Sequence, residues 1–173
     1  MKHIILIGYK SVGKSAIGRE LAREIKMRFI DLDEEVEKIY KRENKLPRNY
    51  RQIMLAVGQE VFRELEHRAL QIALQNVSCC VISLGGGTPI FPKNKILIKS
   101  HTVIQITAPK NIVYERIMMN GKPAFFPDNE HPLVSFNRTW DERKGIYDAL
   151  ASIKIDNSGS LDEAVRIIRE KIN

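Results

Sequence analysis

Short apolar stretches alternate along the chain with longer segments whose apolar residues recur at helical spacing. The mainly apolar, β-branched stretches predict strands at residues 3–7, 28–31, 80–84, 102–107 and 153–156. The segments with apolar residues three and four positions apart predict helices at residues 14–26, 33–44, 48–57, 59–76, 109–119, 138–150 and 160–171. Apolar strands that alternate with helices favour a parallel sheet covered on both faces. We therefore expect one α/β domain over residues 1–173, a three-layer α/β/α fold around a five-stranded parallel sheet.

Two segments interrupt this alternation and are candidates for function. Residues 34–58 form a helical excursion that breaks at Leu46-Pro47. Residues 120–137 contain three prolines, Gly121 and short polar residues, a composition typical of a loop. A loop of this length is uncommon in a compact domain unless it is functional, and we expect it to be a lid.

The composition excludes some classes of protein. The 173 residues suffice for one domain with a hydrophobic core, and 43% hydrophobic with 28% charged residues is ordinary for a globular protein. No apolar run approaches the roughly 20 residues that span a bilayer, and the N-terminus lacks the anatomy of a signal peptide. We expect a cytoplasmic monomer with no membrane partner. The formal net charge is +7, but the basic residues are scattered, which favours the binding of small anions over nucleic acid.

The cysteines and histidines do not form a pattern that predicts a metal site or a disulfide. Cys79 and Cys80 are adjacent in a predicted strand, where successive side chains point to opposite faces, so we expect reduced thiols. The histidines are not clustered in the sequence and are expected to be structural: His3, His67, His101 and His131.

The segment Gly8–Ser15 matches G-x-x-x-x-G-K-[ST], the pattern of a phosphate-binding loop. It joins a predicted strand to a predicted helix, so backbone N–H groups and the helix dipole would face an anion. Lys14 would reach the β- and γ-phosphates, and the Ser15 hydroxyl would bind Mg²⁺. The alternative is a chance match in a glycine-containing turn, against which the flanking strand and helix argue. We expect nucleotide contacts from Ser11, Val12, Gly13, Lys14, Ser15 and Ala16.

Two acidic residues, Asp31 and Asp33, stand at the end of the second predicted strand. Residues two apart on a strand share a face, so both carboxylates are expected in one cleft near the phosphate loop. One carboxylate would support Mg²⁺ through its water shell, and the other would accept the hydrogen of an attacking hydroxyl. Alternatively, Asp33 caps the helix that follows.

Further along the chain, Arg63 and Glu66 are three residues apart on a predicted helix and are therefore neighbours on its surface. They fit either a solvent-exposed ion pair or an arginine fork for a substrate carboxylate, held by the glutamate. Three glycines, Gly85–Gly87, follow a buried strand and indicate either a tight turn or the close approach of a ligand or another segment.

Three more cations are grouped around the candidate lid. Arg116 precedes the loop, Lys122 lies within it, and Arg143 follows it. Cations that fold over a transferring phosphoryl group stabilise its charge, but each residue taken alone also fits a solvated surface position.

Taken together, these residues resemble the shikimate kinase family, which are small ATP-dependent kinases of the nucleoside-monophosphate-kinase-like P-loop fold. The resemblance covers nearly the whole chain and keeps its order. It comprises the phosphate loop, Asp-Leu-Asp at 31–33, Phe-Arg-x-x-Glu at 62–66, Gly-Gly-Gly at 85–87 and Arg-x-x-x-Tyr at 143–147. The loop alone indicates only a superfamily, whereas the ordered series is much more specific.

The resemblance implies a role for each matching residue. Asp33 would bind the ring hydroxyls of shikimate and act as the base, and Asp31 would lie in the Mg²⁺ shell. Arg63 and Arg143 would grip the substrate carboxylate, with Glu66 orienting Arg63. The remaining positions are Gly86 and Gly87, with backbone contacts to the ring, Arg116 near the adenine, and Lys122 near the ATP phosphates.

This chain departs from the family pattern in the lid and in the substrate-binding wall. The family lid begins Arg-Pro-Leu-Leu, whereas Lys122 begins it here and keeps the charge without the guanidinium fork. The family has Arg-x-Pro-Leu-Tyr where residues 143–147 read Arg-Lys-Gly-Ile-Tyr. The segment between Asp33 and Arg63 is longer than usual and carries Asn-Lys-Leu-Pro in place of Gly-x-Ser-Ile.

Three functions are compatible with this pattern. The first is ATP-dependent phosphorylation of the 3-hydroxyl of shikimate, with ATP and Mg²⁺. The second is a related small-molecule kinase that acts on another hydroxy acid, a polyol or a nucleoside, which the altered wall and lid suggest. The third is a nucleotide-dependent binding or regulatory module without transfer activity.

Overall fold

A computed structural model describes residues 2–75 and 78–172 of the chain. A single parallel sheet holds its five strands in the order β2-β3-β1-β4-β5, which confirms the predicted sheet. The strands are β1 (Ile4–Ile7), β2 (Arg28–Asp31), β3 (Cys80–Ser83), β4 (Thr102–Thr107) and β5 (Ile153–Asp156).

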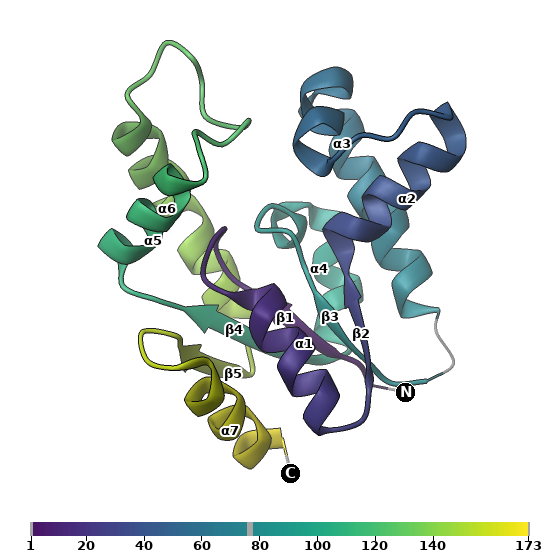
Figure 1. Ribbon diagram of the computed structural model, residues 1–173, viewed down its shortest axis with the longest axis vertical. Helices are drawn as coiled ribbons and strands as arrows, with labels where there is room; N and C mark the ends of the chain where they lie inside the picture. Colours follow the sequence, from purple (N-terminus) through teal and green to yellow (C-terminus); the bar gives the residue numbers. More distant parts are fainter. Residues whose placement is uncertain (1, 76–77, 173) are drawn as a thin grey trace.

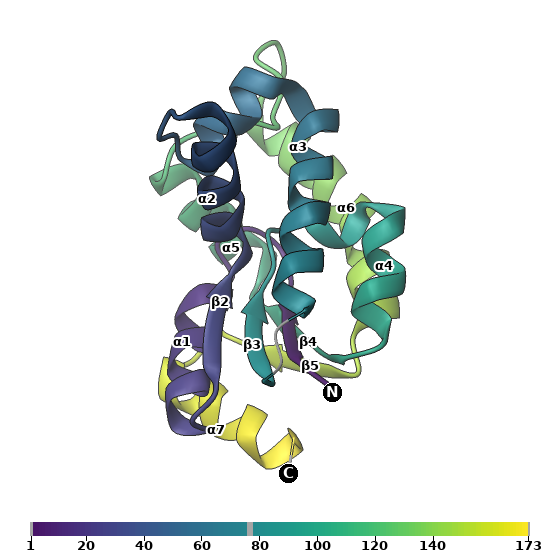
Figure 2. The same cartoon turned by 90° about the vertical axis from the view of Figure 1, so that its right-hand side faces the viewer.

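Helices cover the two faces of the sheet, as the alternating sequence pattern requires (Figure 2). On one face α1 (Lys14–Glu24) packs against α7 (Leu161–Ile172). The other face carries α3 (Tyr50–Leu74), α4 (Pro92–Lys99) and α6 (Pro132–Leu150). The sheet is therefore the middle of three layers, and the hydrophobic core lies between its strands and the helices on both faces.

The central strand β1 shows why the strand sequences are apolar on both faces. Ile5, Leu6 and Ile7 are fully buried between the two helical layers. Burying one side chain of this size contributes about 1.5–3 kcal/mol, so a run of three anchors the strand that leads directly into the phosphate loop.

Two groups of elements rise above the carboxyl ends of the strands (Figure 1). One consists of α2 (Leu32–Asn44), which packs on α3, together with the start of α3. The other consists of α5 (Lys110–Met119), the start of α6, and residues 120–131 between them, called the lid loop below. The two predicted helices at 48–57 and 59–76 fall within α3, which consists of two helical segments that meet at Gly58. The backbone angles of Gly58 are non-helical, with φ +79° and ψ 167°, so the predicted break is confirmed; residue 76 lies outside the described residues.

The structure corrects three expectations about element boundaries. Helix α4 was not expected; it is short, begins with Pro92, and buries only Asn94 and Ile98, so it has a weak periodic pattern. Helix α6 begins at Pro132 rather than at 138, because proline is favoured in a first helical turn, and the predicted loop 120–137 therefore ends at 131. Helix α2 begins one residue early, at Leu32, since the Asp31 side chain caps it.

The two thiols and two of the histidines, His3 and His101, lie at the amino ends of strands. Cys79 and Cys80 are both free, as expected, and Cys80 is buried. The structure brings His3 and His101 together with their ring centroids 5.0 Å apart. The buried His3 ring accepts a hydrogen bond from the Cys80 N–H and contacts the Leu74 carbonyl oxygen, which agrees with a structural role. Among the described residues, no helix is both long and apolar enough to span a membrane.

Candidate active site

A cavity of about 290 Å³ opens at the carboxyl ends of β1, β2 and β3. The phosphate loop, the β2–α2 junction, α3, the glycine turn after β3, the lid loop and α6 all contribute to its walls. The predicted site residues that line it are Ser11, Gly13, Lys14, Ser15, Ala16, Asp31, Asp33, Arg63, Glu66, Gly86, Gly87 and Arg143. Segments far apart in the sequence are thus brought to one site.

The phosphate loop is held in a conformation that depends on glycine. Gly8 and Gly13 have φ angles of +142° and +94°, which side-chain-bearing residues rarely adopt. The buried Lys14 ammonium donates to the carbonyl oxygens of Gly8 and Tyr9, at 3.1 and 2.8 Å. Burial lowers the pKa of Lys14 to about 8, against the opposing effect of Asp33 and Asp31. The loop therefore carries a desolvated cation at the N-terminus of α1.

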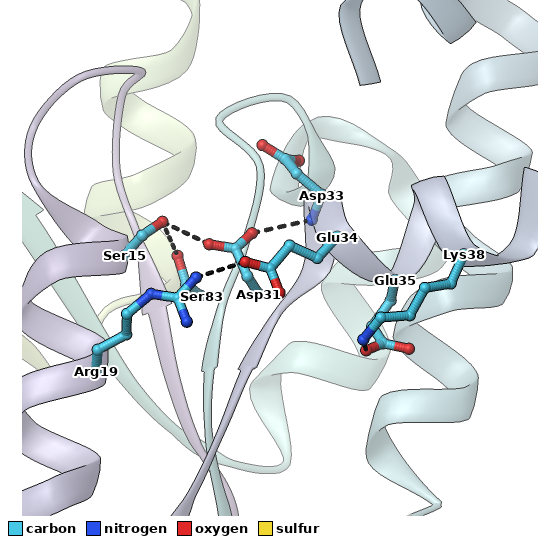
Figure 3. A network of polar contacts seen from close by, with 8 residues as sticks. All are labelled: Ser15, Arg19, Asp31, Asp33, Glu34, Glu35, Lys38 and Ser83. Atoms are coloured by element: carbon cyan, nitrogen blue, oxygen red, sulfur yellow. Dashed lines mark hydrogen bonds and ion pairs between the residues drawn. The ribbon is translucent and has the colours of Figure 1, made fainter. Parts of the chain in front are cut away.

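Figure 3 shows how Ser15 is connected to the ends of two neighbouring strands. Its hydroxyl donates to Asp31 Oδ2 at 2.6 Å and lies 3.4 Å from the hydroxyl of Ser83. Asp31 and Ser83 are register partners in the β2–β3 pair. Hydroxyl and carboxylate oxygens are the donors that Mg²⁺ prefers, so this set fits a magnesium ion beside the phosphate loop.

Asp33 lies in the first turn of α2, not two residues along the strand from Asp31 as expected, and its carboxylate points away from that of Asp31 (Figure 3). The helix cap is Asp31, whose Oδ1 accepts a hydrogen bond from the Asp33 N–H at 3.1 Å. Burial, Glu66 and Asp31 raise the pKa of Asp33 to about 7, although Lys14 and Lys10 oppose the shift. A carboxylate with a pKa close to neutrality is suited to accept a proton in this cavity.

Arg63 and Glu66 form a pair that is not solvent-exposed. Their side chains are 14% and 2% exposed, and Arg63 Nη1 donates to Glu66 Oε2. Glu66 Oε1 accepts a second hydrogen bond, from Thr88 Oγ1 at 2.7 Å. The carboxylate is fixed at both oxygens, so it holds the Arg63 guanidinium at the cavity wall.

The three glycines after β3 each leave space for a different neighbour. A Cβ atom on Gly85 would lie 2.8 Å from Asp33 Oδ1, and one on Gly86 would lie 3.2 Å from the backbone nitrogen of Lys10. A Cβ atom on Gly87 would overlap the guanidinium of Arg63. The three consecutive glycines are therefore explained by the close approach of neighbouring residues, and not only by a tight turn.

Arg143 is buried on α6, at 6% exposure, and closes the cavity on the side of the lid loop. Its Cζ atom lies 5.2 Å from the ring centroid of Tyr9 and 4.6 Å from that of Phe125. One turn further along, the Tyr147 hydroxyl donates to the Gly86 carbonyl oxygen at 2.5 Å. The Arg-x-x-x-Tyr segment therefore connects α6 to both the phosphate loop and the glycine turn.

Three predicted nucleotide-binding residues do not line the cavity. Val12 is a buried residue of the phosphate loop, and Arg116 is partly exposed on α5. Lys122 Nζ donates to the Pro127 carbonyl oxygen at 2.7 Å and pairs with Asp128 at 3.0 Å, so it is engaged within the lid loop.

The structure also adds cavity residues that the sequence analysis did not select: Lys10, Tyr50, Met54, Ser83 and Phe125. Ser83 ends a strand that neighbours the strand of Asp31, so sheet register was the signal that could have found it. Lys10 stands inside the phosphate-loop motif at a position the motif leaves open. Tyr50 carries no sequence signal, because its place depends on how α3 folds over the loop.

Comparisons with known proteins agree with this arrangement. A model of the protein family described as shikimate kinase matches residues 10–173. The shikimate kinase of Pelotomaculum thermopropionicum is 36% identical over 171 residues, which are 97% of this chain and 94% of that protein. A shikimate kinase of Thermus thermophilus is 35% identical over 171 residues, which are 98% of this chain and 89% of that protein.

Solved structures show the same fold. The structure of shikimate kinase from Aquifex aeolicus has a TM-score of 0.78 at 29% identity and covers 98% of this chain and 95% of that one. That of the Acinetobacter baumannii enzyme in complex with shikimate has a TM-score of 0.85 at 23% identity, over 99% and 93% of the two chains. The family model spans nearly all of the sequence, and the phosphate loop, Asp33, Arg63 and the glycine turn meet at one cavity. The chain therefore belongs to the shikimate kinase family.

Proposed function

We propose that this protein transfers the γ-phosphoryl group of ATP to the 3-hydroxyl of shikimate, forming shikimate 3-phosphate for aromatic amino acid biosynthesis. One observation carries the proposal: Asp33 and Arg63 line the same cavity as Lys14. A candidate base and a candidate carboxylate-binding arginine thus face the loop that would hold the phosphates. The relatives named shikimate kinase over the full length of the chain support the same activity.

The phosphate loop provides the nucleotide half of the site. Backbone N–H groups from Ser11 to Ala16 hold the phosphates at the helix N-terminus, and Lys14 neutralises their charge. Ser15 and Asp31 hold Mg²⁺, which supplies charge neutralisation on the phosphate oxygens when bound. We assign Arg116 to the adenine, and Lys122 to the phosphates after it leaves its lid-loop partners.

The opposite wall provides the acceptor half. The guanidinium groups of Arg63 and Arg143 bind the shikimate carboxylate, since a planar fork suits a carboxylate bidentately. Glu66 fixes Arg63, and the backbone of Gly86 and Gly87 contacts the ring. These groups bring the hydroxyl next to the phosphate loop.

The transfer step follows from this placement. The shikimate hydroxyl oxygen forms a bond to the γ-phosphorus while the bond between that phosphorus and the β–γ bridging oxygen breaks, and ADP leaves. The hydroxyl proton passes to the Asp33 carboxylate. Catalysis is mainly positioning and charge neutralisation, because phosphoryl transfer needs little covalent participation by the protein.

The same proposal includes a single-domain cytoplasmic monomer that binds neither nucleic acid nor membrane. Its support is that the groups named above that line the cavity come from one chain. A site assembled within one protomer has no need of a second copy.

A coupled assay of ADP release tests the activity. We expect ATP consumption that depends on shikimate and that Lys14→Ala abolishes. The second candidate, a kinase for another acceptor, rests on Tyr50 and Met54 in the cavity wall. Turnover with gluconate or a nucleoside and none with shikimate would favour that candidate. Tight ATP binding without transfer to any acceptor would contradict both.

A further inference from the structure

Lys10 is a cavity cation to which the activity described above assigns no task. It is the third residue of the phosphate-loop motif, and its side chain lies along the cavity wall. The Lys10 ammonium donates to the Tyr50 hydroxyl and lies 5.0 Å from the Tyr50 ring centroid. The Lys10 backbone lies close to the glycine turn, since a Cβ atom at Gly86 would lie 3.2 Å from its nitrogen.

Tyr50 is itself held firmly at the start of α3. Its backbone N–H donates to Glu37 Oε1 of α2 at 2.8 Å. The preceding Asn49 and the following Gln52 form a reciprocal capping box around the first turn. The phenol is therefore a fixed acceptor, which orients the flexible lysine side chain.

The other cavity cations differ from Lys10 in their partners. Arg63 is paired with Glu66, and Arg143 lies against two aromatic rings. Lys14 donates to two loop carbonyl oxygens. Within residues 2–75 and 78–172, Lys10 has a neutral phenol as its partner and no carboxylate within ion-pair distance. Its full charge is available to an anion.

We propose that the Lys10 ammonium contacts the transferring phosphoryl group, and that Tyr50 is the positioning residue that aims it. The inference rests on the proposed function and names a further residue for it. The shikimate carboxylate is the other anion in the site, but it belongs to the end of the cavity formed by Arg63, Arg143 and Gly87. Lys10 extends instead from the loop that holds the phosphates, and an ammonium group binds phosphate as a compact point charge.

The lining of the cavity supports this location. Lys10 shares the cavity with Asp33 on the acceptor side and with Lys14 on the nucleotide side. A cation on this wall stabilises negative charge that moves during transfer.

Steady-state kinetics of four single variants test the inference. Lys10→Met removes the charge at similar length, Lys10→Arg restores it, Tyr50→Phe removes only the hydroxyl, and Lys99→Met is an exposed control. We expect Lys10→Met to lower kcat about 10-fold or more, since one preorganised charge contributes on this scale, with a smaller change in KM for shikimate.

The remaining variants separate positioning from packing. Lys10→Arg should recover most of kcat. Tyr50→Phe should lower kcat less than Lys10→Met does and should have no further effect in the Lys10→Met background, as expected for two residues that act together. Thermal unfolding of each variant identifies any that lose the fold.

The possible failures are distinguishable. If the wild-type protein phosphorylates shikimate and folded Lys10→Met keeps its kcat, the inference is wrong and the proposed function stands. A kcat loss that Lys10→Arg does not restore also overturns it. A wild-type protein that transfers no phosphate to shikimate overturns the proposed function and this inference together.

Discussion

Gly87 leaves the space that the guanidinium of Arg63 occupies. A Cβ atom built on Gly87 would overlap the Cζ, Nη1 and Nη2 atoms of that side chain. The glycine turn and α3 therefore fit together only because position 87 has no side chain. The carboxylate-binding arginine owes its position to this gap as much as to its partner Glu66.

A methyl group at position 87 should displace the arginine without unfolding the protein. The overlapping atoms are the far end of a flexible side chain, so Gly87→Ala should shift Arg63 and weaken shikimate binding. We expect a clear rise in KM for shikimate and little change in KM for ATP, measured by steady-state kinetics. Gly145→Ala is the matched control, because a Cβ atom there meets nothing within 4 Å. Equal KM values in the two variants would contradict this account of the turn.

Removal of the Arg63 guanidinium should affect the KM for shikimate much more than the KM for ATP. Arg63→Ala should raise KM for shikimate about 10- to 100-fold, the scale of a lost hydrogen bond to a charged group, and KM for ATP far less. The variant also leaves Glu66 buried without its cation, so thermal unfolding must be measured beside the kinetics. Similar effects on the two substrates would argue against a carboxylate-binding role.

The activity should depend on the ionisation of Asp33. Since its pKa is about 7 and the ionised form is the base, kcat/KM for shikimate should rise as the pH increases through this region. A pH profile of initial rates measures this rise directly. Asp33→Asn should abolish the rise and lose most of the activity. An activity that is flat between pH 5 and 8 would exclude this carboxylate as the base.

The same group should make the protein without substrates less stable as the pH rises. The pKa of Asp33 is raised from 3.8 to about 7 on folding, so the folded state holds the proton more tightly than the unfolded state in this range. This difference in proton binding between the folded and unfolded states disappears as the pH rises above 7. Asp33→Asn should therefore be more stable than the wild type at pH 8, by about 1–3 kcal/mol, and the difference should shrink at pH 5. Urea unfolding at both pH values measures it, and a destabilised variant at pH 8 would refute the linkage.

The fold was predictable because its signals are local. Strands such as β1 are apolar throughout, since both faces of a parallel sheet are buried, and glycine marks the phosphate loop at fixed positions. Helix α4 was missed because only two of its residues are buried and its apolar positions do not form a strong stripe. The first turn of α6 was missed because Pro132 was interpreted as a loop residue, although proline is also compatible with the first turn of a helix.

The candidate site was predictable only in part, for a related reason. Asp33, Arg63 and Gly87 belong to short ordered motifs, so their residue types and order could be recognised. Lys10 and Tyr50 meet because α3 begins above the phosphate loop, an arrangement set by tertiary packing that leaves no mark in either local sequence. The engagement of Lys122 within its own loop is likewise a property of the folded lid and not of its composition.

The account depends most directly on the product that forms when the protein is mixed with Mg²⁺, ATP and shikimate. ³¹P NMR of the reaction mixture, with mass spectrometry of the acceptor, identifies that product. We predict one phosphate monoester on the 3-hydroxyl of shikimate for each ADP released, and far slower formation of this product with the Asp33→Asn variant. ADP released without a phosphorylated acceptor, or a phosphate ester that Asp33→Asn forms as fast as the wild type, would contradict the account.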